Sequence, residues 1–323
     1  LVIGTHGVGA WILDNVQPLV ELADAMQENV YLFDIREATD WESWSRDSNL
    51  GRSTFQGENP REGAYIDFYL AEAPGRGSDS PTIRITDARG QRFLDLPNVR
   101  ATAGINRAVW NLTWSGPESV GGGGAGGGGG RGGRGGSGPP VAPGTYTATL
   151  TVGGQELSKD FQVRGDPAGE ATQADYEART EAAIRGRDIQ TDLNRMIGSV
   201  VDLRTQLENL QETILGKGLA NEGEIRSGID AAREALGELD NDLRRPPPSM
   251  GYRIYPRLSE QLSFVTRGIS QAQARPTEGQ LQVLSEVEGE IRLKEQVLQS
   301  IIDGPIASLN RLLQGQAKIR VGG

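Results

Sequence analysis

Apolar residues recur at alternating steps of four and three along the second half of the chain, most regularly between residues 172 and 214. This spacing places them on one face of a long helix, like the a and d positions of a heptad. Thr172 and Asp175 have the spacing of a capping box, which predicts the start of the helix. Such a face must pack against other helices, because each buried apolar side chain contributes about 1.5–3 kcal/mol. The seam consists of Ile189, Leu193, Met196, Val200, Leu203, Leu207, Leu210 and Ile214.

The remaining C-terminal sequence supplies the partner helices. Two further runs repeat the pattern, and the proline-rich segment 245–252 between them cannot be helical. A second capping box, Thr277 with Gln280, predicts a last helix that Gly304-Pro305 should break or bend. We expect residues 170–316 to form a long up-down-up three-helix bundle with a split middle helix; the alternative is four antiparallel helices, two of them short. The apolar positions are Ile225, Ile229, Ala232, Leu236, Leu239 and Leu243; Leu258, Leu262, Val265, Ile269 and Ala272; and Leu281, Leu284, Val287, Ile291, Leu298, Ile302, Leu309, Leu312 and Leu313.

Between residues 63 and 166 the pattern changes to short alternating strands. Glycines at 153 and 154 predict a tight hairpin turn between the last two strands. Such a series of strands in about 100 residues is typical of an immunoglobulin-like β-sandwich. The glycine-rich run at 120–138 should be a flexible, disordered loop; its Arg131 and Arg134 also allow the alternative of an RNA-binding segment. The predicted strands are 65–70, 82–86, 92–96, 105–114, 143–152 and 157–163.

The N-terminal region shows less order. Residues 1–16 read as a hairpin of two short apolar strands around a glycine-bearing turn, which is marginal alone and so requires a larger sheet or another domain. Residues 17–62 lack a sustained period but keep aromatic residues, which predicts a linker that wraps over a surface. We expect the candidate partner-docking residues to be Trp11, Trp41, Trp44 and Phe55.

Composition narrows the possible partners and functions. The net charge of −10 argues against nucleic acid or anionic lipid as the main partner. There is no cysteine, so disulfide, thiol and cysteine–zinc chemistry are excluded. The chain contains no run of 18 apolar residues, so we expect no membrane span of its own. It begins at Leu1 inside a predicted strand, which suggests that sequence upstream has been removed or is not included.

The sequence offers no candidate active site. His6 is the single histidine, so neither a catalytic triad away from it nor a histidine metal cluster can form. A carboxylate pair for glycoside hydrolysis could come from Asp67, Glu72, Asp87 and Asp95, but nothing in the sequence selects two of them. The glycine-rich run lacks the Gly-Lys-Ser/Thr ending of a phosphate loop. We therefore expect no catalytic residues, no metal site and no cofactor.

The order of these parts resembles the C-terminal part of bacterial exported BNR-repeat, sortilin-type β-propeller proteins. The resemblance is carried by LVIGTHGVGAWILDN at 1–15, GINRAVWNLTWSGPE at 104–118, APGTYTATLTVGGQELSKDFQV at 142–163 and the Ala-Arg-Pro-Thr break at 274–277. It implies that residues 1–16 are the remnant of a propeller-closing hairpin, and that Val8 stands where the family motif usually has arginine. It also implies export, and hence a periplasmic or extracellular location. More weakly, the layout resembles an accessory periplasmic subunit of a bacterial photosynthetic reaction-centre complex.

Two functional hypotheses follow from the sequence. In the first, the chain is a non-catalytic extracytoplasmic scaffold or binding subunit that stabilises a larger envelope or membrane-associated complex. Its partners would be protein subunits of that complex, including the missing propeller portion. In the second, it is the C-terminal accessory region of a BNR-propeller, glycoside hydrolase-like enzyme whose active site lies upstream.

Overall fold

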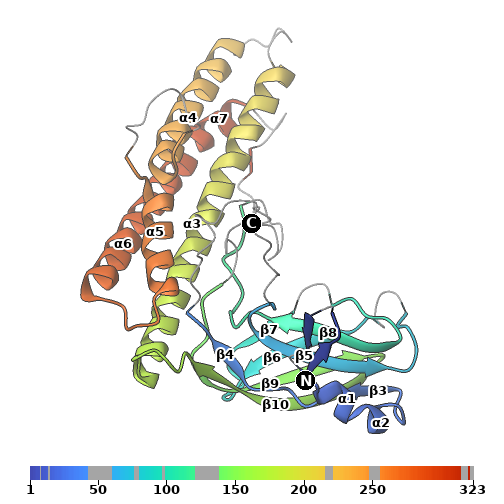
Figure 1. The fold of residues 1–323 in the computed structure, drawn as a ribbon. Helices are drawn as coiled ribbons and strands as arrows, with labels where there is room; N and C mark the ends of the chain where they lie inside the picture. Colours follow the sequence, from blue (N-terminus) through green and yellow to red (C-terminus); the bar gives the residue numbers. More distant parts are fainter. Residues whose placement is uncertain are drawn as a thin grey trace. The chain divides into compact units, whose positions relative to one another are not determined.

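The structure is a computed structural model that describes residues 1–7, 9–13, 15–42, 60–75, 80–96, 99–120, 138–214, 221–246, 255–313 and 319–320. These residues are divided between two compact units. The sheet unit contains described residues up to 115, together with 139–180 and 273–275. The helical unit contains the other described residues, from 116–120 and 181–214 onward. The chain therefore combines sheets with a long helix and several shorter helices (Figure 1).

Two sheets make up most of the sheet unit. The five-stranded sheet has the order β4-β10-β9-β6-β7, and the three-stranded sheet has the order β3-β5-β8. Pairing is antiparallel throughout, except that β4 runs parallel to β10. The strands are β3 (Val30–Leu32), β4 (Ala38–Asp40), β5 (Ala64–Leu70), β6 (Thr82–Asp87), β7 (Phe93–Asp95), β8 (Gly104–Trp110), β9 (Gly144–Val152) and β10 (Gln155–Gly165).

The predicted hairpin of β9 and β10 is confirmed. Gly153 and Gly154 both have positive φ, 57° and 83°, as the tight turn between twisted strands requires. On β9 the alternating residues Tyr146, Ala148 and Leu150 are buried, while those between them are partly exposed. The alternation that predicted the strand therefore also determines its buried face.

Aromatic residues from the two sheets pack together in the core of the sheet unit. Trp110 packs against Tyr146 and Phe161 with ring centroids 5.1 and 5.9 Å apart. Burial raises the pKa of the Tyr146 hydroxyl, which donates a hydrogen bond to the Ala142 carbonyl. The strand predicted for 105–114 ends earlier, at Trp110, because Leu112 has a left-handed φ of 58° that a continuing strand cannot accommodate.

The segment expected to be a linker is part of both sheets. Residues 17–42 form two short helices, α1 (Gln17–Val20) and α2 (Leu22–Ala25), followed by β3 and β4. Strand β3 pairs with β5, and β4 pairs with β10. The expectation of a linker is corrected here, because strands of three residues are too short to show a period of two. Residues 43–59, including Trp44 and Phe55, lie outside the described residues.

The helices follow the predicted pattern closely. They are α3 (Gln173–Ile214), α4 (Glu222–Leu243), α5 (Leu258–Gln271), α6 (Glu278–Ile301) and α7 (Ala307–Leu312). All eight seam residues of α3 are buried in one hydrophobic core with residues of the other helices. The capping boxes at Thr172 and Thr277 are both formed. In contrast to the predicted pattern, Ala272 and Leu281 are exposed, because Ala272 follows the end of α5 and Leu281 lies off the buried face of α6.

The last helix bends without ending. Residues Ile302–Ile306 form a π-helical turn, η3, that contains Pro305 and leads directly into α7. Proline lacks a backbone N–H, and a wider turn accommodates its ring. Beyond this turn Leu309 and Leu313 are again buried in the core of the helical unit, as the pattern predicted.

The first two turns of α3 belong to the sheet unit. Arg179 is buried, and its Nη2 donates to Asp40 Oδ2 at 3.0 Å and to the Val141 carbonyl at 3.2 Å. A Cβ atom on Gly165 would lie 2.4 Å from the Tyr176 hydroxyl oxygen, so glycine is required where β10 ends. The sequence placed the boundary near residues 166–170, whereas the division of the structure falls inside α3.

Candidate interaction surface

The N-terminal hairpin is the most exposed apolar element of the described chain. Its strands, β1 (Val2–Thr5) and β2 (Gly9–Ile12), pair antiparallel with Ile3 opposite Trp11, as predicted. Every described residue from 1 to 13 is exposed. The large apolar side chains include Ile3, which is 52% exposed, and Trp11, which is 64% exposed. The other four are Leu1, Val2, Ile12 and Leu13.

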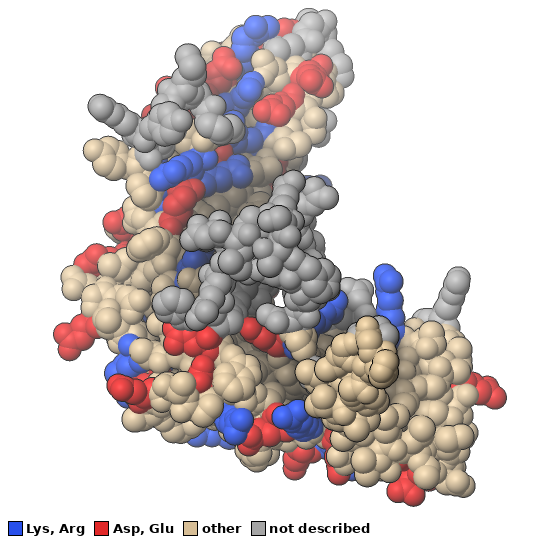
Figure 2. Space-filling model, in the orientation of Figure 1, with Lys and Arg blue, Asp and Glu red and all other residues tan. Residues whose placement is uncertain are grey.

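The hairpin also lacks charged side chains. Residues 1–13 contain no Lys, Arg, Asp or Glu, and no Lys or Arg occurs before Arg36. Figure 2 shows the corresponding surface without blue or red, whereas both signs of charge are interspersed over other parts of the molecule. A contiguous apolar element left in water indicates an interaction site, since single exposed apolar residues are common but grouped ones are not.

A polar cluster around the buried Asp67 carboxylate follows the hairpin directly. Asn15 Nδ2 donates to Asp67 Oδ2 at 2.7 Å, and both residues are buried. Arg107 holds the same carboxylate through two hydrogen bonds, Nε to Oδ1 at 2.6 Å and Nη2 to Oδ2 at 2.8 Å. The Arg107 guanidinium also lies 4.6 Å from the centroid of the Tyr65 ring. We call Asn15, Asp67 and Arg107 the anchor. It attaches the chain just after the hairpin to strands β5 and β8, which carry Asp67 and Arg107.

Of the other predicted docking residues, the structure describes only Trp41. Trp41, directly after β4, is 49% exposed, and no ring contact between it and Trp11 is found within the described residues. Trp44 and Phe55 lie outside the described part of the chain. Sequence reasoning found Trp11 but missed the anchor, since nothing local marks Asn15 as the partner of a carboxylate 52 residues away.

The four candidate carboxylates are not assembled into a catalytic pair. Asp67 belongs to the anchor, and Asp87 accepts backbone hydrogen bonds from Gln91 and Arg92 in a turn. Asp95 is bound by Arg84 through two hydrogen bonds of 2.7 and 2.9 Å, and the hydrogen bond to this guanidinium lowers the Asp95 pKa. The fourth carboxylate, Glu72, lines a shallow cavity.

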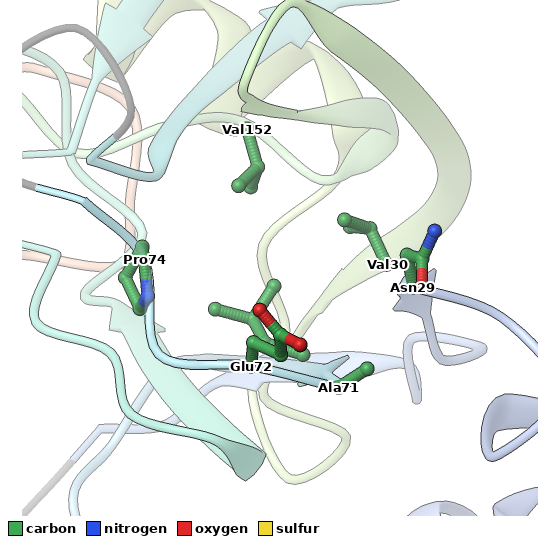
Figure 3. Close-up of a pocket in the computed structure, with 7 residues that line it drawn as sticks. Asn29, Val30, Ala71, Glu72, Pro74 and Val152 are labelled. Atoms are coloured by element: carbon green, nitrogen blue, oxygen red, sulfur yellow. The ribbon is translucent and has the colours of Figure 1, made fainter.

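That cavity has a volume of about 350 Å³ (Figure 3). Glu72 is the one ionisable group among its lining residues, and its other polar side chain is Asn29. Glycoside hydrolysis needs two carboxyl groups on either side of the scissile bond, and one carboxylate cannot serve as both. The remaining lining residues are Val30, Leu70, Ala71, Pro74 and Val152.

The described residues contain neither a metal-binding group nor a membrane-spanning helix. Within them, no group of three or more His, Cys, Asp or Glu side chains is placed to hold a metal ion. No helix among the described ranges has both the length and the apolar character needed to cross a bilayer. Comparison of the chain with family models, curated proteins and solved structures found no match.

Proposed function

We propose that this protein is a non-catalytic, extracytoplasmic scaffold or binding subunit that stabilises a larger envelope or membrane-associated complex. The observation that carries the proposal is the β1–β2 hairpin, which exposes six large apolar side chains and has no Lys, Arg, Asp or Glu side chain. Burying these side chains on a partner would remove them from water at about 25 cal/mol per Å² of apolar surface. The partners are therefore protein subunits rather than nucleic acid, in keeping with the net charge of −10.

The proposed architecture suits a scaffold. We propose that the two sheets form an immunoglobulin-like sandwich and that the helices form a three-helix bundle whose middle helix is split into α4 and α5. The packing of Trp110 on β8 against Tyr146 and Phe161 of the other sheet supports the first proposal. The single hydrophobic core formed by the helices supports the second.

The resemblance to BNR-repeat propeller proteins suggests one form of the partner. In that case β1 and β2 would complete the last blade of a propeller, either upstream in the same polypeptide or as a separate piece. The chain would then act in the periplasm or outside the cell. An accessory subunit of a photosynthetic reaction-centre complex is a further instance of the same class.

The alternative function is an accessory region of a propeller glycoside hydrolase. It is favoured by the same resemblance, because proteins of that layout often carry a hydrolase label. The catalytic carboxylates would then lie upstream, since Asp67, Asp87 and Asp95 have structural partners here.

Isolation of the tagged chain from the cells that make it tests the proposal. We expect a complex much larger than the 34.7 kDa chain, and we expect Ile3→Asp to abolish it without changing the melting of the chain. Phe264→Asp is a matched control, because Phe264 is 83% exposed on α5 and lies outside the hairpin. A wild-type chain that is purified alone as a monomer contradicts the scaffold role. Release of sugars from a glycan panel by the full-length protein would favour the alternative.

A further inference from the structure

Among the described residues, no strand pairs with either outer edge of the N-terminal hairpin. Leu1 and Leu13 exchange both of their backbone hydrogen bonds, at 3.0 and 2.8 Å. Opposing residues in an antiparallel pair alternate between bonded and non-bonded pairs. The pairs Ile3–Trp11 and Thr5–Gly9 are therefore bonded, and the pairs Val2–Ile12 and Gly4–Ala10 are not.

The non-bonded pairs direct their backbone groups outward. The N–H and C=O groups of Val2 and Gly4 face the outer edge of β1, and those of Ala10 and Ile12 face the outer edge of β2. In the described structure this sheet contains β1 and β2 alone. Such rows of unpaired backbone groups are templates for another strand.

Both faces of the hairpin are apolar as well. Val2 and Ile12 lie on one face, and Ile3 and Trp11 lie on the other, because successive side chains of a strand alternate. Strands with apolar side chains on both faces belong in the interior of a sheet that is covered on both sides. A partner strand with charged side chains would lose their hydration against this surface, so the fitting strand is uncharged and apolar.

We propose that the hairpin accepts an uncharged, apolar β-strand of a partner sheet along an outer edge, and that the anchor holds it ready to do so. This inference rests on the proposed function and specifies the chemistry of its partner. In it Asn15 is a positioning residue: its amide ties the end of the hairpin to the Asp67 carboxylate, which Arg107 neutralises. The hairpin is thereby presented in one orientation, which reduces the entropy lost on binding.

The edge is tested with variants at Gly4 and Ala10 in the full chain, measured by the yield of the native complex. Gly4→Pro and Ala10→Pro each remove one outward N–H and leave the bonded pairs intact. Gly4→Ala and Ala10→Ser are the matched controls; a Cβ on Gly4 meets no atom within 4 Å. We expect at least one proline variant to reduce the yield more than tenfold and both controls to retain it.

The outcomes separate the two proposals. If the wild-type chain forms no complex, the proposed function fails. If a complex forms and Ile3→Asp abolishes it but both proline variants retain it, the hairpin binds by its faces and strand addition is wrong. Protection of the Gly4 or Ala10 amide from hydrogen exchange in the complex, but not in the isolated chain, is the positive result that a face-only contact does not give.

The anchor is tested by the mobility of the hairpin. The chain has no cysteine, so Ala10→Cys provides a unique position for a spin label. We expect Asn15→Ala to increase the mobility of this label and to reduce the yield of the complex. Asn106→Ala is the matched control, because Asn106 is a buried amide on β8 whose hydrogen bonds go to residues 102 and 104. The positioning role would be wrong if Asn15→Ala left the mobility of the label unchanged, or if Asn106→Ala increased this mobility by the same amount.

Discussion

Two hairpins of this protein share the same local pairing and differ in everything around it. The β9–β10 hairpin has β6 along one edge and β4 along the other, and one of its faces is buried. The β1–β2 hairpin pairs only with itself in the described structure, and both of its faces are exposed. Hydrogen bonds within a hairpin contribute little net free energy, because water competes for the same groups. The comparison shows that neighbours, rather than the turn, decide whether a hairpin supports a core or remains available to a partner.

The largest effect should come from placing a carboxylate on the buried face of β9, whereas the same change on the exposed β1 should have little effect. Leu150 on β9 is buried, and Leu150→Asp should cost about 4 kcal/mol or more through the lost apolar contact and the unpaired charge. Ile3→Asp should change the free energy of unfolding by about 0.5 kcal/mol or less. Tryptophan fluorescence in a urea titration measures the sheet unit alone, since no tryptophan follows Trp114. Equal loss in the two variants would show that β1–β2 is part of the fold.

A smaller effect is expected from truncating one aromatic residue in each hairpin. Phe161 on β10 packs against Trp110 and Tyr146, so Phe161→Ala should lower the free energy of unfolding by about 3–5 kcal/mol. Trp11→Ala should change it by about 0.5 kcal/mol or less, because Trp11 is exposed. Differential scanning calorimetry checks both values. A clear drop in the melting temperature of Trp11→Ala would contradict the contrast.

Deleting residues 121–136 tests whether β9 depends on the sequence that precedes it. The composition of this segment predicts a flexible loop, and shortening such a loop changes its closure entropy by about 1 kcal/mol. The backbone bonds Trp114 N to Pro139 O and Val141 N to Leu112 O hold the two ends of the connection. We expect the urea midpoint of the sheet unit to change slightly and the native complex to persist. Loss of the complex with folding intact would assign this segment a binding role.

The smallest expected effect concerns the exposed ion pair between Lys159 on β10 and Asp34. Lys159 donates to Asp34, and chiefly this hydrogen bond raises the Lys159 pKa. A raised lysine pKa stabilises the fold below the unfolded value of about 10.4, and this stability is lost as the pH rises through the folded value. The pair is largely exposed, so the loss should be about 1 kcal/mol or less. Urea midpoints of wild type and Lys159→Met between pH 9 and about 12 measure this loss of stability. If the difference between the two midpoints stays constant across this range, the ion pair makes no pH-dependent contribution.

Elements with a sustained period were predictable because their own residues specify them. The helix predicted from Thr172 to Ile214 is found as Gln173–Ile214, with the same buried seam. The turn at Gly153-Gly154 was also predictable, because two adjacent glycines readily adopt the positive φ angles that a tight hairpin turn needs. By contrast, β3 and β4 were missed. Three residues carry no readable alternation, and each strand exists because β5 or β10 offers it an edge.

The candidate interaction surface also has one part that the sequence predicted and one part that it did not. Trp11 and its apolar neighbours were identified from sequence, because a two-stranded hairpin with such residues cannot bury them by itself. The anchor could not be predicted: Asn15 meets Asp67 across 52 residues, and Arg107 meets it across 40. From the sequence, Asp67 was one of four carboxylates considered for a catalytic pair. In the structure it is bound by the buried Asn15 and by the partly exposed Arg107.

The sequence by itself determined the helix seams, their caps, the strand faces and the absence of thiol and histidine-cluster chemistry. Each of these depends on residue types and on spacings within one element. Only the tertiary structure decided that the first turns of α3 belong with the sheets and that Arg179 is buried against Asp40. It also decided that β1–β2 pairs with no other strand of the described ranges. These features depend on which distant segments come to share a surface. Local periodicity does not encode that choice, because it follows from the summed packing of the whole chain.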